Sequence, residues 1–392
     1  MPLAKVVVSA RGAERLRSGH PWVYRSDIRS SDAESGDLVD VASERGRPLG
    51  FGYWSSASQI ALRFLGADAV DDERVLLRDR VRAALAFRET LAIDGTAWRA
   101  VNGEADRLPG LIVDVYGASP DRVVVVQTLT QAMDRLLPVV GEVLSELLTP
   151  HGILARNDPK VRRLEGLPES VEVVSGVVPD QISVREGPIE YLVDVRRGQK
   201  TGLFLDQREN HAMAVAFARG RALDAFSYHG GFALRLAGVC EHVTALDSSE
   251  PAVAEIAAGA KRNGLTNIEP REVNVFDELR EMEIARQRFD TIVLDPPAFA
   301  KNKASVERAA AGYKEINLRA MKLLEPGGHL ITCSCSYNVN EEFFHAILEQ
   351  AAIDARATVS LVEKRAQARD HPVLLNVPET HYLKCFVLRK LA

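Results

Sequence analysis

The chain has 392 residues but only four cysteines, and it lacks both a long apolar run and an excess of positive charge. Four unevenly placed cysteines cannot form the disulfide framework of a secreted domain. The strongest apolar run, "RVVVVQTLT", has the length of a strand and falls well short of the roughly 20 residues that a membrane-spanning helix needs. The first residues have neither the apolar segment nor the cleavage site of a secretory signal. These absences predict a reduced, cytoplasmic protein that does not enter a membrane.

Positive charge is scarce overall but gathers locally. The net charge is −5, so no global basic field points to nucleic acid. Residues 1–30 nevertheless hold six basic and two acidic side chains, and residues 301–322 hold the same numbers. A solvated face is the ordinary explanation for any one such cluster. Several clusters in one acidic protein can still hold phosphate groups locally.

Three common site patterns are missing as well. None of the nine histidines stands at a ligand spacing with a cysteine, which argues against a metal enzyme. The glycine turn in "LDAFSYHGGF" is not G-x-G-x-x-G, and no Lys-Ser/Thr pair follows it. Neither the dinucleotide fingerprint nor the phosphate-binding P-loop therefore fits this chain.

Three segments differ in their periodicity. Residues 1 to about 67 read as short strands separated by glycine turns, and we predict a small all-β barrel there. A helix over residues 71–92 opens a second segment in which strands and helices are mixed. From about residue 205 strands and helices alternate, as in a doubly wound α/β sheet. We therefore predict an α/β protein with domains at residues 1–70, 71–190 and 191–392.

Two acidic side chains end neighbouring strands of the third segment. Asp224 ends the first strand, and Gly230 and Gly231 then allow a tight turn with close backbone approach. Asp247 ends the next strand in "VTALDSS", where a carboxylate suits the two hydroxyl groups of a ribose. An alternative is that Asp247 caps the helix that follows it.

A third acid, Asp295, emerges from the buried strand of "FDTIVLDPPAF". Pro296 and Pro297 follow it, and they stop the strand and leave rigid carbonyl groups. In an open α/β sheet, ligands bind in the crevice beyond the carboxyl ends of the strands. The three acids therefore predict a ligand site at this edge of the sheet.

Several motifs in order carry a family resemblance. The segments "GQKTGLFLDQREN", "LDAFSYHGGFALRLA", "ALDSS", "LDPPAFAKNK" and "SCSYNV" resemble the class I S-adenosylmethionine-dependent 23S ribosomal RNA cytosine-5 methyltransferases that begin with a PUA domain. The resemblance implies an N-terminal PUA β-barrel, a central α+β domain and a C-terminal Rossmann-like methyltransferase domain. It also implies S-adenosylmethionine as cofactor, large-subunit ribosomal RNA as partner and a homodimer.

By the resemblance, three motifs surround the cofactor. The first glycine turn would face its methionine part, the acid of the second strand would hold its ribose, and "GQKTGLFLDQR" would close over it. Asn274 stands where the family commonly has an acid, and its carbonyl oxygen can still accept a hydrogen bond from the adenine amino group. The cofactor residues so implied are Lys200, Asp206, Arg208, Asp224, Ser227, Tyr228, Gly230, Asp247, Ser248, Asn274 and Asp295.

Two of the four cysteines stand one residue apart in "LITCSCSYNV". A thiolate that adds to carbon 6 of cytosine makes the ring enamine-like, so that the poorly nucleophilic carbon 5 can react. We interpret the segment as a strand, which points both thiols to one face, with Cys333 about 6–7 Å deeper than Cys335. The resemblance also places the nucleophile in Ser-Cys-Ser. We assign Cys335 as nucleophile and Cys333 as a packing residue, and the alternative is that both are buried small hydrophobes.

The resemblance gives Asp295 a second role, in catalysis. A protonated Asp295 would donate to ring nitrogen 3 as negative charge develops on the base, while a proline carbonyl, such as that of Pro296, accepts from the amino group. Some related enzymes have a second cysteine beside this motif, but "DPPAF" has none. The group that removes the carbon-5 proton is therefore unassigned, and water can serve.

Two other functions stay open. "DPPAF" also resembles the Asn/Asp-Pro-Pro-aromatic motif of enzymes that methylate exocyclic amines, with Phe299 near the aromatic position, and that chemistry needs no thiol. A non-catalytic RNA-binding assembly factor is the other alternative. We expect the N-terminal barrel to contact RNA through basic residues such as Arg11 and Arg15, and the target base to be exposed or flipped into the pocket.

Overall fold

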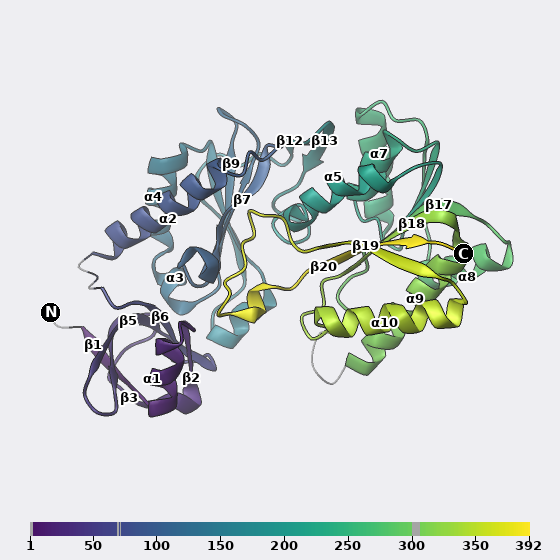
Figure 1. The fold of residues 1–392 in the computed structure, drawn as a ribbon. Helices are drawn as coiled ribbons and strands as arrows, with labels where there is room; N and C mark the ends of the chain where they lie inside the picture. Colours follow the sequence, from purple (N-terminus) through teal and green to yellow (C-terminus); the bar gives the residue numbers. More distant parts are fainter. Residues whose placement is uncertain (1–2, 69, 71, 300–305) are drawn as a thin grey trace. The chain divides into compact units, whose positions relative to one another are not determined.

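The computed structural model describes residues 3–68, 70, 72–299 and 306–392 (Figure 1). Its internal contacts divide the chain into two compact units. Unit 1 comprises Met1–Glu186, Leu192–Leu205 and Arg369–Thr380, and unit 2 comprises Gly187–Tyr191, Asp206–Ala368 and His381–Ala392. Each unit is thus assembled from separate pieces of the chain. The expected α/β fold class is confirmed, and the two segments expected before residue 190 share one unit almost entirely.

Unit 1 begins with a six-stranded sheet of order β2-β6-β5-β4-β1-β3. The prediction that this segment is all-β is wrong in one place, because it contains the helix α1 (Ala10–Arg17). The Ser9 hydroxyl caps this helix by accepting the N–H of Gly12 at 3.1 Å, and Ala13 and Leu16 bury its inner face. The strands are β1 (Ala4–Val8), β2 (Trp22–Tyr24), β3 (Ile28–Ser31), β4 (Leu38–Ser43), β5 (Pro48–Trp54) and β6 (Ile60–Gly66).

A second sheet of unit 1 has five strands in the order β11-β10-β9-β8-β7. The helix predicted over residues 71–92 is α2 (Glu73–Glu89), and it begins where the Asp72 carboxylate accepts the N–H groups of Arg74 and Val75. This helix packs beside α4 (Leu137–Leu148). The other elements are β7 (Ala97–Asn102), β8 (Leu111–Tyr116), β9 (Val123–Thr128), α3 (Gln131–Arg135), β10 (Gly152–Asn157) and β11 (Ser170–Gly176).

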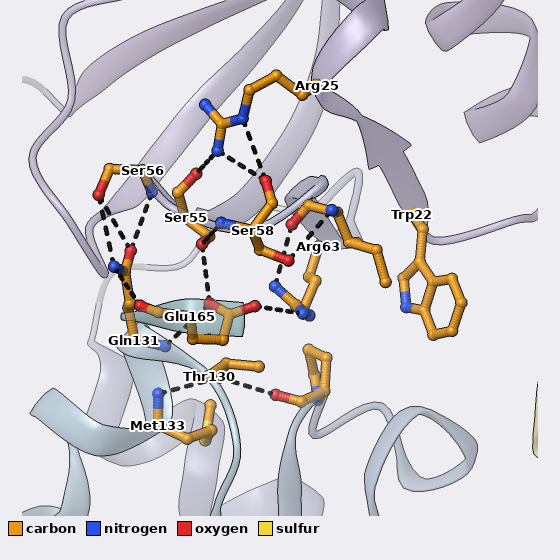
Figure 2. A network of polar contacts seen from close by, with 12 residues as sticks. Trp22, Arg25, Ser55, Ser56, Ser58, Arg63, Thr130, Gln131, Met133 and Glu165 are labelled. Atoms are coloured by element: carbon orange, nitrogen blue, oxygen red, sulfur yellow. Dashed lines mark hydrogen bonds and ion pairs between the residues drawn. The ribbon is translucent and has the colours of Figure 1, made fainter. Parts of the chain in front are cut away.

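A buried polar network joins the first sheet to the central segment of unit 1 (Figure 2). Arg63 on β6 meets the Glu165 carboxylate at 2.7 Å, and both side chains are less than a tenth exposed. Ser55 donates to the other carboxylate oxygen at 2.8 Å. Gln131 donates to the main-chain carbonyl of Glu165 at 2.8 Å and accepts the N–H of Ser56 at 2.9 Å. Because the charged atoms are paired, their mutual attraction offsets the desolvation cost of burying them.

Unit 2 is built on a seven-stranded sheet of order β16-β15-β14-β17-β18-β20-β19. Neighbouring strands are parallel except at β20, which runs antiparallel to both β18 and β19. A ribbon of β12 (Ile182–Glu186) and β13 (Ile189–Val193) precedes it along the chain. The strands are β14 (Arg221–Ala225), β15 (His242–Asp247), β16 (Ile268–Glu272), β17 (Phe289–Leu294), β18 (Leu324–Ser334), β19 (Val359–Arg365) and β20 (Lys384–Lys390).

Helices cover both faces of this sheet (Figure 1). On one face Phe232 and Ile256 belong to a core cluster with Val243 of β15. On the other face Leu279 and Phe344 belong to a second cluster, and α9 packs beside α8 and α10. The helices are α5 (Arg208–Phe217), α6 (Gly231–Ala237), α7 (Glu250–Arg262), α8 (Val275–Ile284), α9 (Val306–Leu323) and α10 (Glu341–Ala355).

The strand order of unit 2 reverses between β14 and β17. The strands β15 and β16 extend the sheet on one side of β14, and β17 and β18 extend it on the other. Such a reversal leaves a crevice beyond the carboxyl ends of the strands, and ligands of doubly wound sheets bind there. Asp224, Asp247, Asp295 and Cys335 all lie at or just beyond the carboxyl ends of these strands.

Candidate active site

The loop after β14 has a constrained backbone. Phe226, Tyr228 and Gly230 have φ angles of +65°, +50° and +81°. For the two aromatic residues this conformation is strained, by about 1–3 kcal/mol each, and such strain occurs mainly at functional sites. The Ser227 N–H donates to the Leu246 carbonyl at 2.9 Å and fixes the loop against the next strand. The conformation of this loop is therefore held by a main-chain hydrogen bond to the neighbouring strand β15.

Asp224 is a fully buried acid beside this loop. Its Oδ2 accepts the N–H of Ala233 in the first turn of α6 at 2.9 Å, while its buried Oδ1 has no partner in the described part of the chain. Burial raises the pKa of Asp224 to about 7; the nearby charge of Asp295 adds to this, and hydrogen bonds from Ser227 and Ala233 oppose it. A buried oxygen without a partner and a raised pKa together indicate a place for a cationic or N–H-bearing ligand group.

The Asp247 carboxylate is held from both sides by main-chain N–H groups. Its Oδ2 accepts from Tyr228 and its Oδ1 from Ser249, each at 2.9 Å. Ser249, and not Asp247, is the N-cap of α7, since its hydroxyl accepts the N–H of Ala252. Asp247 is half exposed, and each oxygen keeps a second lone pair for a hydroxyl group. Ser248 is exposed beside it.

Two other expected cofactor residues have partners within unit 2. Asn274 is the N-cap of α8, and its Oδ1 accepts the N–H groups of Phe276 at 3.0 Å and Asp277 at 3.4 Å. Its carbonyl oxygen is therefore already engaged, which leaves the amide N–H groups for a ligand. Asp206 is buried and accepts the hydroxyl of Tyr382 at 2.8 Å.

The remaining two residues of the "GQKTGLFLDQR" segment fall in different units. Arg208 begins α5 in unit 2 and is buried, with its guanidinium 3.9 Å from the Glu209 carboxylate. Lys200 belongs to unit 1, has a φ of +53° and places its ammonium 4.3 Å from the centre of the Phe204 ring. Unit 2 thus contains every expected cofactor residue except Lys200.

The proline motif and the exposed thiol meet at the ends of adjacent parallel strands, β17 and β18. The thiol of Cys335 donates to the Pro296 carbonyl across 3.9 Å between sulfur and oxygen. Asp295 directly precedes this proline, is half buried and donates its own N–H to the Ala225 carbonyl at 3.3 Å. A half-exposed thiol, a rigid carbonyl acceptor and a carboxyl group are therefore gathered at one edge of the sheet.

The two neighbouring cysteines have different surroundings. Strand β18 ends at Ser334, so the prediction that Cys335 lies within the strand is wrong; Cys335 is the first residue beyond it and is half exposed. Cys333 is fully buried opposite Cys385 of β20. A hydrogen bond with Cys385, reinforced by burial, raises the pKa of Cys333 well above its usual value. Since the thiolate is the nucleophile, Cys333 is chemically inert and Cys335 is the accessible thiol of the pair.

Two residues that flank Cys335 were missed by the sequence analysis. Lys384 of β20 is 2% exposed, and its ammonium donates to the carbonyl of Ser336 at 2.8 Å. Tyr313 of α9 is buried, with its hydroxyl 2.8 Å from the Ser336 hydroxyl. The lysine inside the apolar strand "YLKCFVL" could have indicated a functional contact, because a buried ammonium needs a specific partner.

Phe299 of the proline motif packs among other aromatic rings. Its ring centre lies 4.8 Å from that of Tyr313, 5.9 Å from that of Phe276 and 6.3 Å from that of Phe226. It is half buried and packs against the core cluster beneath α9. The protein's own side chains therefore occupy much of this ring's surface.

The two arginines expected to contact RNA both lie on α1 in unit 1. The Arg11 guanidinium is 2.6 Å from the Asp27 carboxylate, with two thirds of its side chain exposed. The Arg15 guanidinium lies 4.7 Å from the centre of the Tyr24 ring. The contact of Arg11 and Arg15 with RNA stays a prediction.

The described residues lack two features that would point to other functions. Across residues 3–68, 70, 72–299 and 306–392, no three histidine, cysteine or acidic side chains are grouped so that they could hold a metal ion. Over the same ranges, none of the helices combines the length and apolarity needed to cross a bilayer.

Comparisons with known proteins show the family of the chain. A family model described as a PUA-like domain matches residues 6–66, and one described as an S-adenosylmethionine-dependent methyltransferase matches residues 125–389. The chain is 37% identical, over 99% of its length and 100% of the relative's, to a protein of Pseudoalteromonas atlantica named ribosomal RNA large subunit methyltransferase I. A protein of the same name from Shewanella amazonensis is 38% identical over 94% of this chain and 95% of the relative.

Solved structures show the same fold at lower identity. A protein from Streptococcus mutans assigned as a SAM-dependent methyltransferase superimposes with a TM-score of 0.83 at 20% identity, over the whole of both chains. The protein SMU.776, complexed with SAH, superimposes with a TM-score of 0.85 at 21% identity, again over the whole of both chains.

Proposed function

The chain belongs to the family of PUA-containing, S-adenosylmethionine-dependent methyltransferases named ribosomal RNA large subunit methyltransferase I, and we propose that it forms 5-methylcytidine in 23S ribosomal RNA through a covalent adduct of Cys335. The observation that carries this proposal is the half-exposed Cys335 thiol against the Pro296 carbonyl, with Asp295 beside it. The names of the relatives support ribosomal RNA as the substrate. The PUA-like domain supports an RNA ligand.

The residues of unit 2 fit the cofactor. The unpartnered Oδ1 of Asp224 suits the cationic methionine part, and the doubly anchored Asp247 suits the ribose hydroxyls. Asn274 can offer amide N–H groups to the adenine edge, because its oxygen caps α8. When bound, S-adenosylmethionine supplies an electrophilic methyl group.

The proposed chemistry assigns one step to each group at the strand ends. The Cys335 thiolate forms a bond to carbon 6 of cytosine, and the displaced electron pair moves toward ring nitrogen 3, where protonated Asp295 donates its proton. Carbon 5 then has enamine character and can accept the methyl group. Loss of the carbon-5 proton to water restores the ring double bond and expels the thiolate, and ring nitrogen 3 returns its proton to the Asp295 carboxylate. The Pro296 carbonyl orients the base by accepting from its amino group.

The packing of Phe299 supports this chemistry over methylation of an exocyclic amine. In the alternative, the aromatic residue of the proline motif would lie against the target base. Phe299 is instead held by Phe226, Phe276 and Tyr313. The chemistry of an amine methyltransferase would also leave the Cys335 thiol without a role.

The test is identification of the product. Purified protein would be incubated with labelled S-adenosylmethionine and unmodified large-subunit ribosomal RNA, and the digested RNA would be analysed by mass spectrometry. We expect the label in 5-methylcytidine. Label in an N-methylated base would contradict the proposal, and absence of label from all nucleosides would favour a non-catalytic RNA-binding protein.

We expect cofactor binding to depend on pH through Asp224. The raised pKa of about 7 means that the carboxyl is protonated at lower pH, whereas a cationic ligand group needs the carboxylate. The affinity for S-adenosylhomocysteine, whose ammonium is charged throughout this range, should fall about tenfold per pH unit below 7 and be flat above it. Calorimetric titration from pH 5.5 to 8.5 would measure this. Asp224→Asn should bind weakly with no pH dependence; a flat profile in the unaltered protein would contradict the assignment.

Other expectations follow from an RNA substrate. Arg11 and Arg15 are proposed to contact RNA phosphates from the PUA-like domain, and the cytoplasm is the expected location. A homodimer is expected from the family resemblance.

A further inference from the structure

We propose that Lys384 is a positioning residue of this site, whose buried ammonium favours the thiolate form of Cys335 and so makes the cysteine nucleophilic near neutral pH. The catalytic value of this effect rests on the proposed function. The effect itself is a change in the ionisation of the Cys335 thiol, which can be measured without RNA and without cofactor.

The backbone around Cys335 fixes the ammonium in place. Lys384 lies directly opposite Ser334 in the antiparallel pairing of β18 and β20. Its Nζ donates to the carbonyl of Ser336 at 2.8 Å and to that of Tyr382 at 2.9 Å. Cys335 lies between Ser334 and Ser336. One of these neighbours is paired with Lys384 across the two strands, and the other accepts a hydrogen bond from its ammonium. An ammonium has three N–H donors, and two of them are used by these carbonyl groups.

The pKa of this lysine also depends on the charge of the thiol. Burial lowers the pKa of Lys384 to about 8, and negative charge on Cys335 and on Glu341 raises it. The interaction between two titrating groups is reciprocal, so a thiolate that stabilises the ammonium is stabilised by it to the same extent. Lys384 is therefore cationic at pH 7, and it loses its charge as the pH rises through about 8.

The other ionisable groups around the thiol do not replace Lys384. Glu341 on α10 already pairs with Lys364 at 2.8 Å. Burial raises the pKa of Tyr313 on α9, so its hydroxyl is neutral at pH 7. Asp295, beyond β17, disfavours a neighbouring anion when it is ionised. Lys384 is thus a cation whose charge is coupled to this thiol.

Lys384 does not itself accept the proton of Cys335. The Cys335 thiol gives its proton to water, and Lys384 keeps all of its protons. The lysine therefore acts as a fixed charge, and it is neither a base nor a nucleophile. The thiolate is then ready to form the carbon–sulfur bond described above.

The measurement is the pH dependence of alkylation of Cys335 by iodoacetamide in the complete protein, followed by peptide mass spectrometry. In the unaltered protein we expect the rate to rise with a midpoint below pH 8.5, the ordinary value for a thiol. In Lys384→Met the midpoint should move up by about one unit or more, which makes alkylation at pH 7 about tenfold slower. Lys384→Arg keeps the charge and should largely restore the profile.

Lys390→Met is the matched control. Lys390 lies on the same strand and also donates to two carbonyl groups, those of Met321 at 3.0 Å and Leu324 at 2.7 Å. Its removal costs comparable main-chain contacts at the other end of β20, so the alkylation midpoint should not move. A shift in both variants would indicate a structural effect and would overturn the assignment of Lys384.

The outcomes separate this inference from the proposed function. A midpoint at or above 8.5 in the unaltered protein would overturn the role of Lys384 even if Lys384→Met did not fold. An unchanged midpoint in a folded Lys384→Met would do the same, and it would leave the product of the reaction unaffected. If the midpoint shifts as expected but Cys335→Ser still forms 5-methylcytidine, the thiolate exists and the covalent mechanism fails.

Discussion

Replacement of Cys335 by serine should lower the formation of 5-methylcytidine by about 10³-fold or more, the scale on which enzymes lose activity when a covalent nucleophile is removed. A serine hydroxyl at neutral pH is too poor a nucleophile to add to carbon 6, even with the oxygen in a similar place. Cofactor affinity should be unchanged, because the residues proposed to hold the cofactor, Asp224 and Asp247, lie on other strands. The assay is incorporation of labelled methyl groups into the RNA, with the labelled nucleoside identified.

Cys333→Ala is the matched control for this variant. Cys333 is two residues away and fully buried, so its replacement removes a thiol without touching the accessible one. We expect nearly full activity from it. RNA that contains 5-fluorocytidine adds a direct test, since a fluorine on carbon 5 cannot leave as a proton does. A denaturation-resistant protein–RNA adduct should form with the unaltered protein and with Cys333→Ala, and its formation by Cys335→Ser would refute the assignment.

Asp295→Asn should reduce turnover by about 10²–10⁴-fold, the usual contribution of a positioned proton donor. The amide can offer a hydrogen bond to ring nitrogen 3, but it cannot transfer a proton. Asp295 also lies close enough to Asp224 to affect its charge, so cofactor affinity is to be measured in parallel. We expect that affinity to change far less than turnover, which single-turnover kinetics and calorimetry would establish.

Asp290→Asn is the comparison for Asp295. Asp290 lies on the same strand at its amino end, where its carboxylate accepts the N–H of Arg221 at 3.0 Å. This variant should retain its turnover because it is at the opposite edge of the sheet. Equal losses in the two variants would show that strand β17 is merely sensitive to the loss of a carboxylate, and Asp295 would then have no chemical role.

The parts of this protein that could be predicted from the sequence are those governed by local pattern. The apolar period over residues 71–92 predicted α2 almost to its ends, because an amphipathic stripe is a property of consecutive residues. The acids at strand ends were found for a similar reason, since "TIVL" followed by Asp-Pro-Pro can only be a strand that stops. Their convergence on one edge then follows from parallel pairing.

The parts that were missed depend on contacts between distant residues. The helix α1 is short and has few apolar residues, and it forms because Ala13 and Leu16 pack into the core of the first sheet. Ser249, rather than Asp247, caps α7, a choice that depends on the N–H of Tyr228 holding Asp247 elsewhere. Lys384 escaped notice because its acceptor, Ser336, is 48 positions away in the chain.

The position of β20 within its sheet has a consequence for the order in which the site is assembled. This strand is inserted between β18 and β19, although both are synthesised before it. During translation β18 therefore emerges with one edge unpaired, and Cys335 stands at its end without the lysine beside it. Closing so long a loop is slow compared with local helix formation. A nascent chain that has not reached residue 384 thus carries an ordinary thiol, and its reactivity should appear only when the sheet is complete.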